Sequence, residues 1–305
     1  MSGAASGRRQ RMVVTGRDGQ VVSSLIERAA AENPFPRRFD VIAIGRPGLD
    51  LSRPETIDIA LREARPDVIV SAAAYTAVDR AETDEVAATI VNGVSAGVLA
   101  ATADSLGVPI VHLSTDYVFD GTKRLPYVET DPVAPIGAYG RSKLAGEEAV
   151  TQATPNHAIL RTAWVYSPFG KNFLKTMLRL AETRDSLNVV GDQVGNPTSA
   201  LDIADAVIAV AGNLLDGDAA GLRGIFHMTG SGEVNWADFA AEIFAQSKSR
   251  GGPSAAVNPI PSSAYPTPAT RPANSRLDCR KLFEAHGVKL PNWPEATAAV
   301  VARLI

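Results

Sequence analysis

Short apolar runs rich in β-branched residues alternate with longer helical patterns along the first half of the chain. The runs fall at 11–16, 40–45, 66–74 and 108–115. Each run is almost continuously apolar, which is typical of a strand covered by helices on both faces. The alternation therefore predicts an α/β fold built on a doubly wound parallel sheet. Ligands of such sheets bind at the carboxyl ends of the strands.

The pattern continues with a strand at 157–166 and loosens beyond it. A helix at 84–107 is expected to end at Gly107, and a proline-rich stretch at 258–276 is too long for a structureless loop in a compact domain. We expect a Rossmann-type lobe with a smaller substrate-binding lobe. The expected boundaries are a disordered tail at 1–11, a nucleotide-binding lobe at 12–166 with a returning segment at about 200–230, and a substrate lobe from 167–199 and 231–305.

Composition excludes several classes of protein. The 305 residues are 45% hydrophobic with a formal net charge of -3, which gives no electrostatic reason to expect nucleic acid or an anionic membrane as a partner. The single cysteine, Cys279, excludes a disulfide framework within the chain. No window approaches twenty apolar residues and no signal peptide is visible, so we expect a cytoplasmic protein with no membrane span.

A glycine turn joins the first expected strand to the first helix. Gly16 and Gly19 lie three apart in "TGRDGQV", where glycine permits a tight turn and a helix N-terminus attracts a pyrophosphate. Val22 occupies the third small position of the usual pattern, so the match is incomplete. The second strand ends at Gly45 and Arg46 without an acid, which favours the 2′-phosphate of NADPH over NADH. The alternatives are a plain turn and a solvated arginine.

Two further segments follow strand ends. Asp50 and Leu51 stand before the second helix, where Asp50 reads as a helix cap on residue type alone. Ala73 and Ala74 leave space beside the backbone after the third strand, and Thr76 can donate a hydrogen bond there. The alternative for the alanines is close packing beneath a helix.

The strongest chemical signal is a hydroxyl pair followed by a tyrosine and a lysine. Ser114 and Thr115 end the fourth strand, with Asp116 next to them. Tyr139 and Lys143 lie four apart on one helix face. A neighbouring ammonium favours the phenolate, which makes the phenol a usable general acid near neutral pH. We therefore expect Thr115 to hold a carbonyl oxygen while Tyr139 protonates it, and Lys143 to bind the nicotinamide ribose.

These motifs resemble the extended short-chain dehydrogenases/reductases and, within them, the dTDP-4-dehydrorhamnose reductases. The resemblance runs from Met12 nearly to the end of the sequence, and rests on "TGRDGQV", "STDYVFDG", "YGRSKLAGE", "RTAWVY" and "AYPTPATRP". It implies NADPH-dependent reduction of the 4-keto group of dTDP-4-dehydro-L-rhamnose to dTDP-L-rhamnose. Use of NADH is left open.

The resemblance also implies site residues. Asp50 becomes an adenine contact, and Thr115, Asp116 and Trp164 lie beside the sugar. The alternative for Trp164 is a core aromatic beneath the fifth strand. The complete set of expected cofactor contacts is Gly16, Gly19, Gln20, Val21, Arg46, Asp50, Leu51, Ala73, Ala74, Tyr75, Thr76, Leu113, Tyr139 and Lys143.

Three matters stay open. Some members of the family form magnesium-bridged dimers, and Glu182 and Asp185 lie in the corresponding region, so both a Mg²⁺ site and a monomer or homodimer remain open. A nucleotide-sugar epimerase or another deoxyhexose reductase would share the fold. A non-catalytic regulatory subunit would have no need of Tyr139, Lys143 and Thr115, which are all present.

Overall fold

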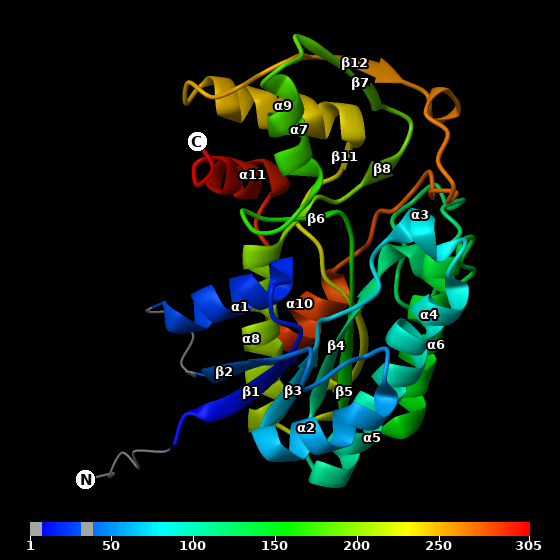
Figure 1. The fold of residues 1–305 in the computed structure, drawn as a ribbon, viewed down its shortest axis with the longest axis vertical. Helices are drawn as coiled ribbons and strands as arrows, with labels where there is room; N and C mark the ends of the chain where they lie inside the picture. Colours follow the sequence, from blue (N-terminus) through cyan, green and yellow to red (C-terminus); the bar gives the residue numbers. More distant parts are fainter. Residues whose placement is uncertain (1–7, 32–38) are drawn as a thin grey trace.

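The computed structural model describes residues 8–31 and 39–305. Its centre is a six-stranded, fully parallel sheet in the order β10–β5–β4–β3–β1–β2 (Figure 1), which confirms the doubly wound α/β fold. The direction of winding reverses between β1 and β3, where such sheets bind ligands. The strands are β1 (Gln10–Thr15), β2 (Phe39–Ile44), β3 (Val68–Ser71), β4 (Ile110–Thr115), β5 (His157–Thr162) and β10 (Gly224–His227).

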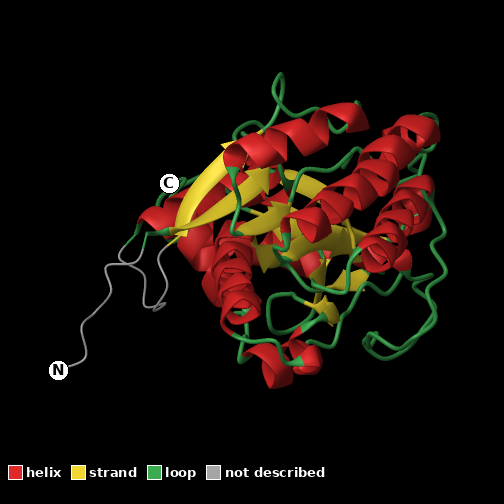
Figure 2. Ribbon diagram, turned by 90° about the horizontal axis from the view of Figure 1, so that it is seen from below, coloured by secondary structure: helices red, strands yellow, loops and turns green. Residues whose placement is uncertain are grey.

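Helices cover both faces of this sheet (Figure 2). One face carries α1 (Gln20–Ala30), α8 (Ala200–Asp216) and α10 (Arg280–His286). The other carries α2 (Ile57–Ala64), α5 (Ser95–Leu106) and α6 (Ala138–Ala153). Two short helices, α3 (Val78–Ala81) and α4 (Glu85–Thr89), precede α5.

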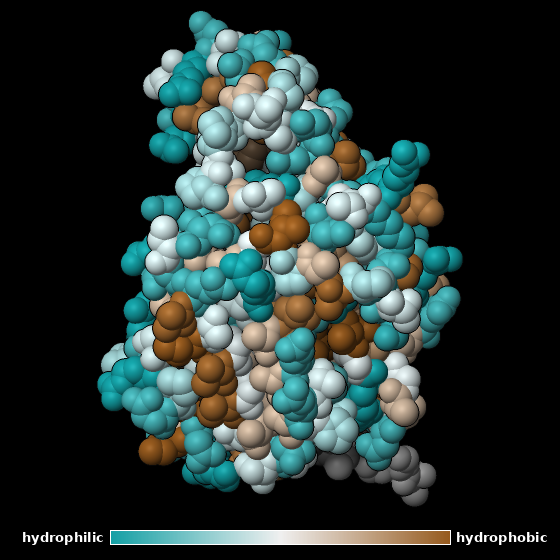
Figure 3. Space-filling model, turned by 90° about the vertical axis from the view of Figure 1, so that its right-hand side faces the viewer, coloured by the Kyte–Doolittle hydropathy of each residue, from teal (hydrophilic) through white to brown (hydrophobic). Residues whose placement is uncertain are grey.

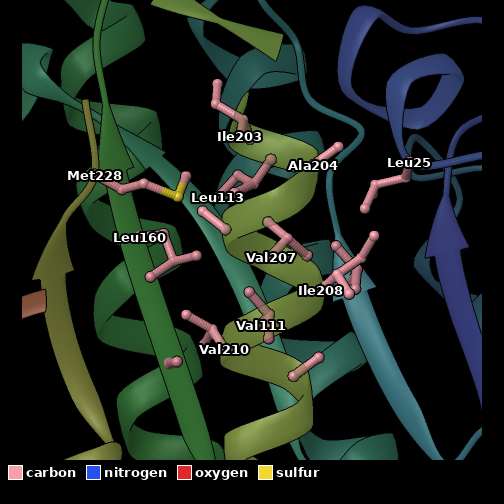
Figure 4. Close-up of a cluster of buried hydrophobic side chains, with 14 of the residues drawn as sticks. Leu25, Val111, Leu113, Leu160, Ile203, Ala204, Val207, Ile208, Val210 and Met228 are labelled. Carbon is pink, nitrogen blue, oxygen red and sulfur yellow. The ribbon is translucent and has the colours of Figure 1, made fainter. Parts of the chain in front are cut away.

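The alternation of side chains along each strand divides the core in two. Met12 and Val14 of β1 pack with Val207 of α8, in the cluster drawn in Figure 4. Val13 points to the opposite face and packs with Leu61 of α2 and Leu99 of α5. The continuous apolar runs of the sequence therefore follow from burial of both faces.

A second set of elements lies beyond the carboxyl ends of the strands, at the top of Figure 1. Its helices are α7 (Phe173–Ala181), α9 (Trp236–Lys248) and α11 (Trp293–Val301). Its two-stranded ladders pair β6 (Val165–Tyr166) with β9 (Thr198–Ser199), β8 (Val194–Gly195) with β11 (Val234–Asn235), and β7 (Ser186–Val190) with β12 (Ala256–Ile260). These elements share a separate apolar cluster that includes Tyr166, Leu174, Phe239, Ile243 and Val300.

The last helix also fastens to the first. Val300 and Val301 of α11 are buried in the second cluster. Just beyond them Arg303 forms two hydrogen bonds with Glu27 of α1, at 2.6 and 2.8 Å. The guanidinium also lies 5.4 Å from the ring centroid of Phe169. Segments from opposite ends of the sequence are thereby held side by side.

The prediction of a disordered tail over residues 1–11 is wrong for residues 10 and 11. β1 begins at Gln10, because the backbone N–H of Arg11 donates to Asp67 at 2.7 Å and Arg8 pairs with the same carboxylate at 2.7 Å. Asp67 precedes β3, so the two adjacent strands are tied where they start. The remainder of that expectation, residues 1–7, lies outside the described residues.

The single strand expected at 157–166 is also corrected. β5 ends at Thr162 and β6 begins at Val165. Between them Trp164 adopts φ +48°, a left-handed conformation that costs free energy in a bulky residue and breaks the pleat. The backbone therefore leaves the sheet at this point and enters the second set of elements.

The helix expected at 84–107 is confirmed, with Gly107 closing it in a left-handed conformation at φ +68°. A π-helical segment, Ile90–Val94, joins α4 to α5. The stretch Glu85–Leu106 is long and apolar enough by length and composition to cross a membrane, contrary to our expectation of no such window. Half of its apolar window is buried, as in the core helix of a globular domain. Figure 3 shows the side of the molecule that lies to the right in Figure 1, near α4 and α6, where hydrophobic residues are interspersed with hydrophilic ones.

A buried ion pair fastens α6 to the sheet. Glu147 of α6 accepts two hydrogen bonds from Arg161 of β5, at 2.9 and 2.6 Å, and a third from Ser114 of β4 at 2.5 Å. Both charged side chains are only 2% exposed. Ser114, whose hydroxyl we expected near a ligand, is thereby engaged in the core. One carboxylate thus joins three elements.

Replacing Glu147 with alanine should strongly destabilise the fold, because Arg161 would remain buried without its counter-charge. We expect Glu147→Ala to lower the free energy of unfolding by about 3–5 kcal/mol, measured by urea denaturation. Glu148→Ala is the matched control, since Glu148 is the exposed neighbour on the same helix. Equal stability of the two variants would contradict this account of the ion pair.

Candidate active site

The turn between β1 and α1 brings the backbone close to the loop after β3. Gly16 has φ +101°, a conformation that favours glycine. A methyl group added to Gly16 would lie 3.3 Å from Ala73 Cβ and 3.3 Å from Val22 Cγ2. Val22 is buried and fills the space under the turn. The departure from the usual third small residue therefore packs the turn without blocking it.

The first turn of α1 is open to an anion. Gly19 is its N-cap, no side chain caps it, and no acid lies in its first turn. The first N–H groups, including those of Gln20 and Val21, therefore fit a phosphate. The Gln20 side chain is used elsewhere, since its Oε1 accepts from Ser167 Oγ and Asn172 Nδ2, both at 2.9 Å. Gln20 thus links the turn to the segment after β6.

Two arginines meet at the end of β2. Arg46 is exposed directly after the strand, and Arg17 in the glycine turn donates to the Arg46 carbonyl at 3.5 Å. No acid occurs at 45–48. The pair fits a 2′-phosphate better than Arg46 alone. We did not single out Arg17 from the sequence, although its place inside "TGRDGQV" was the available signal.

Asp50 and Leu51 are engaged by the protein itself. Asp50 Oδ1 accepts from the N–H of Ser52 at 3.0 Å and from its hydroxyl at 2.8 Å, and these bonds lower the pKa of Asp50. The side chain of Leu51 belongs to the apolar core, and its carbonyl accepts from Ser95 Oγ at 2.6 Å. The expected helix cap is therefore not observed: Asp50 closes a turn onto Ser52, while the N-caps of the next two helical segments are Arg53 and Thr56, neither with a side-chain cap. Adenine contact by Asp50 stays a prediction.

The loop after β3 is held from two sides. Thr15 Oγ1 accepts the N–H groups of Ala72 and Ala73, each at 3.0 Å. The amide of Asn92, in the π-helical segment, accepts from Tyr75 N at 2.8 Å and donates to Tyr75 O at 3.1 Å. Asn92 was missed in the sequence because a buried amide in a long apolar helix has no motif of its own. Together these contacts fix the backbone facing Gly16.

The expected contacts in the same loop differ in exposure. Ala74 is half-buried and Thr76 is exposed. The Tyr75 hydroxyl donates to Asp84 Oδ2 at 3.1 Å. Contact of these residues with a cofactor therefore stays a prediction, while their place at the carboxyl end of β3 is observed.

Thr115 and Asp116 form a polar floor where β4 ends. The Thr115 hydroxyl donates to Asp116 Oδ1 at 2.9 Å. Asp116 is 3% exposed, and its Oδ2 has no hydrogen-bond partner among the described residues. Burial raises the pKa of Asp116 to about 6. A buried acceptor without a partner costs free energy, so this atom fits a hydroxyl of a polar ligand.

Tyr139 stands beside this floor at the start of α6. Glu82 caps the helix by accepting from Ala138 N at 2.9 Å. The ring of Tyr139 packs edge to face with Tyr117, with centroids 5.5 Å apart. Burial raises the pKa of Tyr139 to about 12, and the Thr115 hydroxyl opposes that rise. The phenol is therefore protonated at neutral pH.

Lys143 lies one helical turn after Tyr139 and is 3% exposed. Its ammonium donates to the Leu113 carbonyl at 2.6 Å and lies 3.4 Å from His112 Nε2. Burial lowers the pKa of Lys143 to about 8, while Glu147 opposes the change. The expected lowering of the Tyr139 pKa by Lys143 is absent from this structure, because burial of the phenol dominates.

Trp164 lies at the edge of the second apolar cluster. It is half-buried, and its ring stacks on Trp236 with centroids 3.5 Å apart and planes 9° apart. A methyl group added to Gly195 would lie 2.5 Å from Trp164 Cε2, so only glycine permits this position. Trp164 is thus not a core aromatic beneath β5. Trp236, which the sequence analysis missed, begins α9 after its N-cap Asn235.

The proline-rich stretch at 258–276 is partly regular and then crosses to the cofactor side. Its beginning lies in β12. Further on, Arg271 forms two hydrogen bonds with Asp79 of α3, at 3.0 and 3.1 Å, and Ala269 N donates to the same carboxylate at 3.2 Å. The proline-rich stretch therefore lies against α3, the helix that follows the β3 loop.

A magnesium site within the chain is not supported. Among residues 8–31 and 39–305, no group of three or more His, Cys, Asp or Glu side chains could hold a metal ion. Glu182 and Asp185, which we considered for this role, belong to no such group.

Comparison with known proteins agrees with this arrangement. A family model described as the RmlD substrate binding domain matches residues 10–305. A dTDP-4-dehydrorhamnose reductase of Sinorhizobium fredii is 51% identical over 295 residues, covering 97% of this chain and 98% of that protein.

Solved structures give the same result. A dTDP-4-dehydrorhamnose reductase ortholog from Clostridium acetobutylicum superimposes with a TM-score of 0.88 at 36% identity, covering 97% of this chain and 99% of that one. The enzyme of the same name from Bacillus anthracis, solved in complex with NADP, has a TM-score of 0.88 at 30% identity and covers 97% of this chain and all of its own. The chain therefore belongs to the dTDP-4-dehydrorhamnose reductase family of NAD(P)H-dependent oxidoreductases.

Proposed function

We propose that this protein reduces the 4-keto group of dTDP-4-dehydro-L-rhamnose to dTDP-L-rhamnose with NADPH. The observation that carries the proposal is the meeting of Tyr139, Thr115 and Asp116 at the carboxyl end of β4. A protonated phenol, a hydroxyl and an unpartnered carboxylate oxygen suit a ligand that has both a carbonyl and hydroxyl groups. The glycine turn of Gly16 and Gly19 follows β1, which is separated from β4 by β3 alone.

Tyr139 is the proton donor in this proposal. Its pKa of about 12 keeps the phenol protonated at neutral pH. When bound, NADPH supplies the hydride that adds to the carbonyl carbon. The Thr115 hydroxyl has a single hydrogen, which bonds Asp116 Oδ1 in this structure, so it turns from Asp116 to donate to the carbonyl oxygen when the sugar binds. Tyr139 protonates that oxygen as negative charge develops on it.

Lys143 assists Tyr139 and binds the cofactor. Its ammonium has three N–H groups, and the Leu113 carbonyl and His112 occupy two of them. The third is left for a ribose hydroxyl of the cofactor. When Tyr139 gives up its proton, the Lys143 ammonium stabilises the phenolate that forms, because a nearby positive charge favours the charged form.

The sugar is held by Asp116 and Trp164. Asp116 Oδ2 accepts a hydrogen bond from a sugar hydroxyl, which removes the cost of leaving that buried atom without a partner. Trp236 covers one face of the Trp164 ring and Gly195 lies close to its Nε1 and Cε2 atoms, so the sugar meets the part of the ring that these two residues leave uncovered. The adenine-side contacts stay as expected, at Asp50, Leu51 and the β3 loop.

The alternative functions differ in whether NADPH is consumed and in which product forms. A nucleotide-sugar epimerase regenerates its cofactor, so NADPH would not be consumed. A different deoxyhexose reductase would consume NADPH with another sugar, and a regulatory subunit would consume none. The deciding experiment follows NADPH absorbance with the sugar made freshly from dTDP-glucose by the two preceding enzymes. Stoichiometric NADPH loss with dTDP-L-rhamnose as product supports the proposal, and its absence with verified substrate overturns it.

Removing the Tyr139 hydroxyl should nearly abolish turnover. We expect Tyr139→Phe to lower kcat about 100-fold or more, with the Kd for NADPH little changed, as measured by steady-state kinetics and fluorescence titration. Tyr166→Phe is the control, since the Tyr166 hydroxyl bonds Thr297 at 3.1 Å within the second cluster. Retained turnover in Tyr139→Phe would refute the acid role.

The KM for the nucleotide sugar should rise as the pH falls through about 6, because protonation of Asp116 removes an acceptor. In Asp116→Asn the KM should be high at all pH values and lose this dependence. Because the carboxyl pKa is raised on folding, ionisation of Asp116 destabilises the native state as pH rises from about 4 through about 6. Asp116→Asn should therefore unfold at higher urea than wild type at pH 8. A KM independent of pH in the wild type would contradict the assignment.

The arginine pair should select the phosphorylated cofactor. Replacing both guanidinium groups, in Arg17→Ala/Arg46→Ala, should raise the KM for NADPH about 10-fold or more through loss of charge-assisted hydrogen bonds. The KM for NADH should hardly change. Arg53→Ala is the control, because Arg53 pairs with Glu55 on the exposed surface. Equal effects on the two cofactors would refute a 2′-phosphate site.

A further inference from the structure

A histidine is buried directly behind the lysine. His112 lies in β4, 2% exposed, in register with Ser71 of β3. Its Nδ1 lies 3.0 Å from Ser71 Oγ and its Nε2 lies 3.4 Å from Lys143 Nζ. The imidazole thus connects the ends of two central strands to α6.

The hydrogen bonds define which nitrogen carries the proton. An ammonium can only donate, so His112 Nε2 is the acceptor towards Lys143. The proton of a neutral ring is then on Nδ1, which donates to Ser71 Oγ. The backbone carbonyl of Leu113 supplies the other acceptor, at 2.6 Å from Lys143 Nζ. Two fixed acceptors on consecutive residues therefore orient the ammonium.

We propose that His112 is a positioning residue that orients the Lys143 ammonium and keeps it charged, with Ser71 fixing the tautomer that this requires. The inference deepens the proposed function and rests on it. With His112 and Leu113 each taking one N–H, the third N–H of Lys143 stays aligned for the cofactor ribose and the Tyr139 phenol. Without His112, the buried side chain would lose one acceptor and one orientation.

The charged surroundings favour a neutral histidine. Burial lowers the pKa of His112 well below its usual value. Electrostatic repulsion from Lys143 on α6 and from His157 on β5 lowers this pKa further. Glu147, one turn beyond Lys143, opposes the lowering of the lysine pKa and is paired with Arg161. His112 is therefore neutral near pH 7, where Lys143 is charged, and offers its lone pair there.

The sign of the pH effect follows from this geometry. An acceptor stabilises the ammonium form, so removing it lowers the pKa of Lys143 from about 8. Above the new pKa the lysine is neutral and cannot favour the phenolate. The alkaline limb of the kcat profile should consequently move to lower pH.

The experiment compares His112→Leu, which removes both nitrogens, with His112→Gln, whose amide oxygen can accept near the Nε2 position. We expect His112→Leu to lower kcat about 10-fold, shift the alkaline limb to lower pH and leave the KM for the sugar nearly unchanged. His112→Gln should recover most of the rate and the wild-type limb. His286→Leu is the control, because His286 is also buried but ends α10, on the face of the sheet opposite α6.

A second readout separates this inference from the proposed sugar substrate. NADPH binding, followed by fluorescence titration across pH, needs no sugar. In His112→Leu the affinity should begin to fall at a lower pH than in wild type or His112→Gln. Identical binding and rate profiles in folded His112→Leu would overturn the positioning role, even if the sugar proved to be a different one. A failure of His112→Gln to recover the limb would overturn the acceptor assignment.

Discussion

The ion pair between Glu147 and Arg161 is the constraint on which the site depends. Tyr139, Lys143 and Glu147 follow one another at intervals of four residues, so they share one face of α6. Because Glu147 is bound to β4 and β5 at the same time, that face is pressed against the strand ends. The phenol and the ammonium thereby reach the end of β4 on a rigid helix. Charges buried this deeply also make any other docking of α6 costly.

The elements that the sequence predicted well are those dominated by burial. Continuous apolar runs indicated strands covered on both faces, and the structure has them in a single parallel sheet. The positions of Gly16, Thr115, Tyr139 and Lys143 followed because strand ends and helix starts determine them. The family resemblance added Trp164 and Tyr75, which residue type alone did not single out.

What the sequence did not predict depends on contacts between distant segments. Trp164, at which the strand breaks, stacks on Trp236, which is far away in the chain. His112 and Asn92 look like ordinary core residues until β3, β4 and α6 are assembled around them. Whether Lys143 or burial controls the pKa of Tyr139 is likewise a matter of distance and solvent exposure, which no motif encodes.

The contact of Arg303 with Glu27 and the burial of Val300 and Val301 have a consequence for biosynthesis. The cluster against which Trp164 and Trp236 pack is closed by α11, which is synthesised after all the other elements described here. The six-stranded sheet likewise needs β10, at Gly224–His227, before its far edge is paired. A nascent chain can therefore pack β1 to β5 early but leaves the second apolar cluster incomplete until α11 has been made. Chaperones that shield apolar surface would find their target in this incomplete cluster.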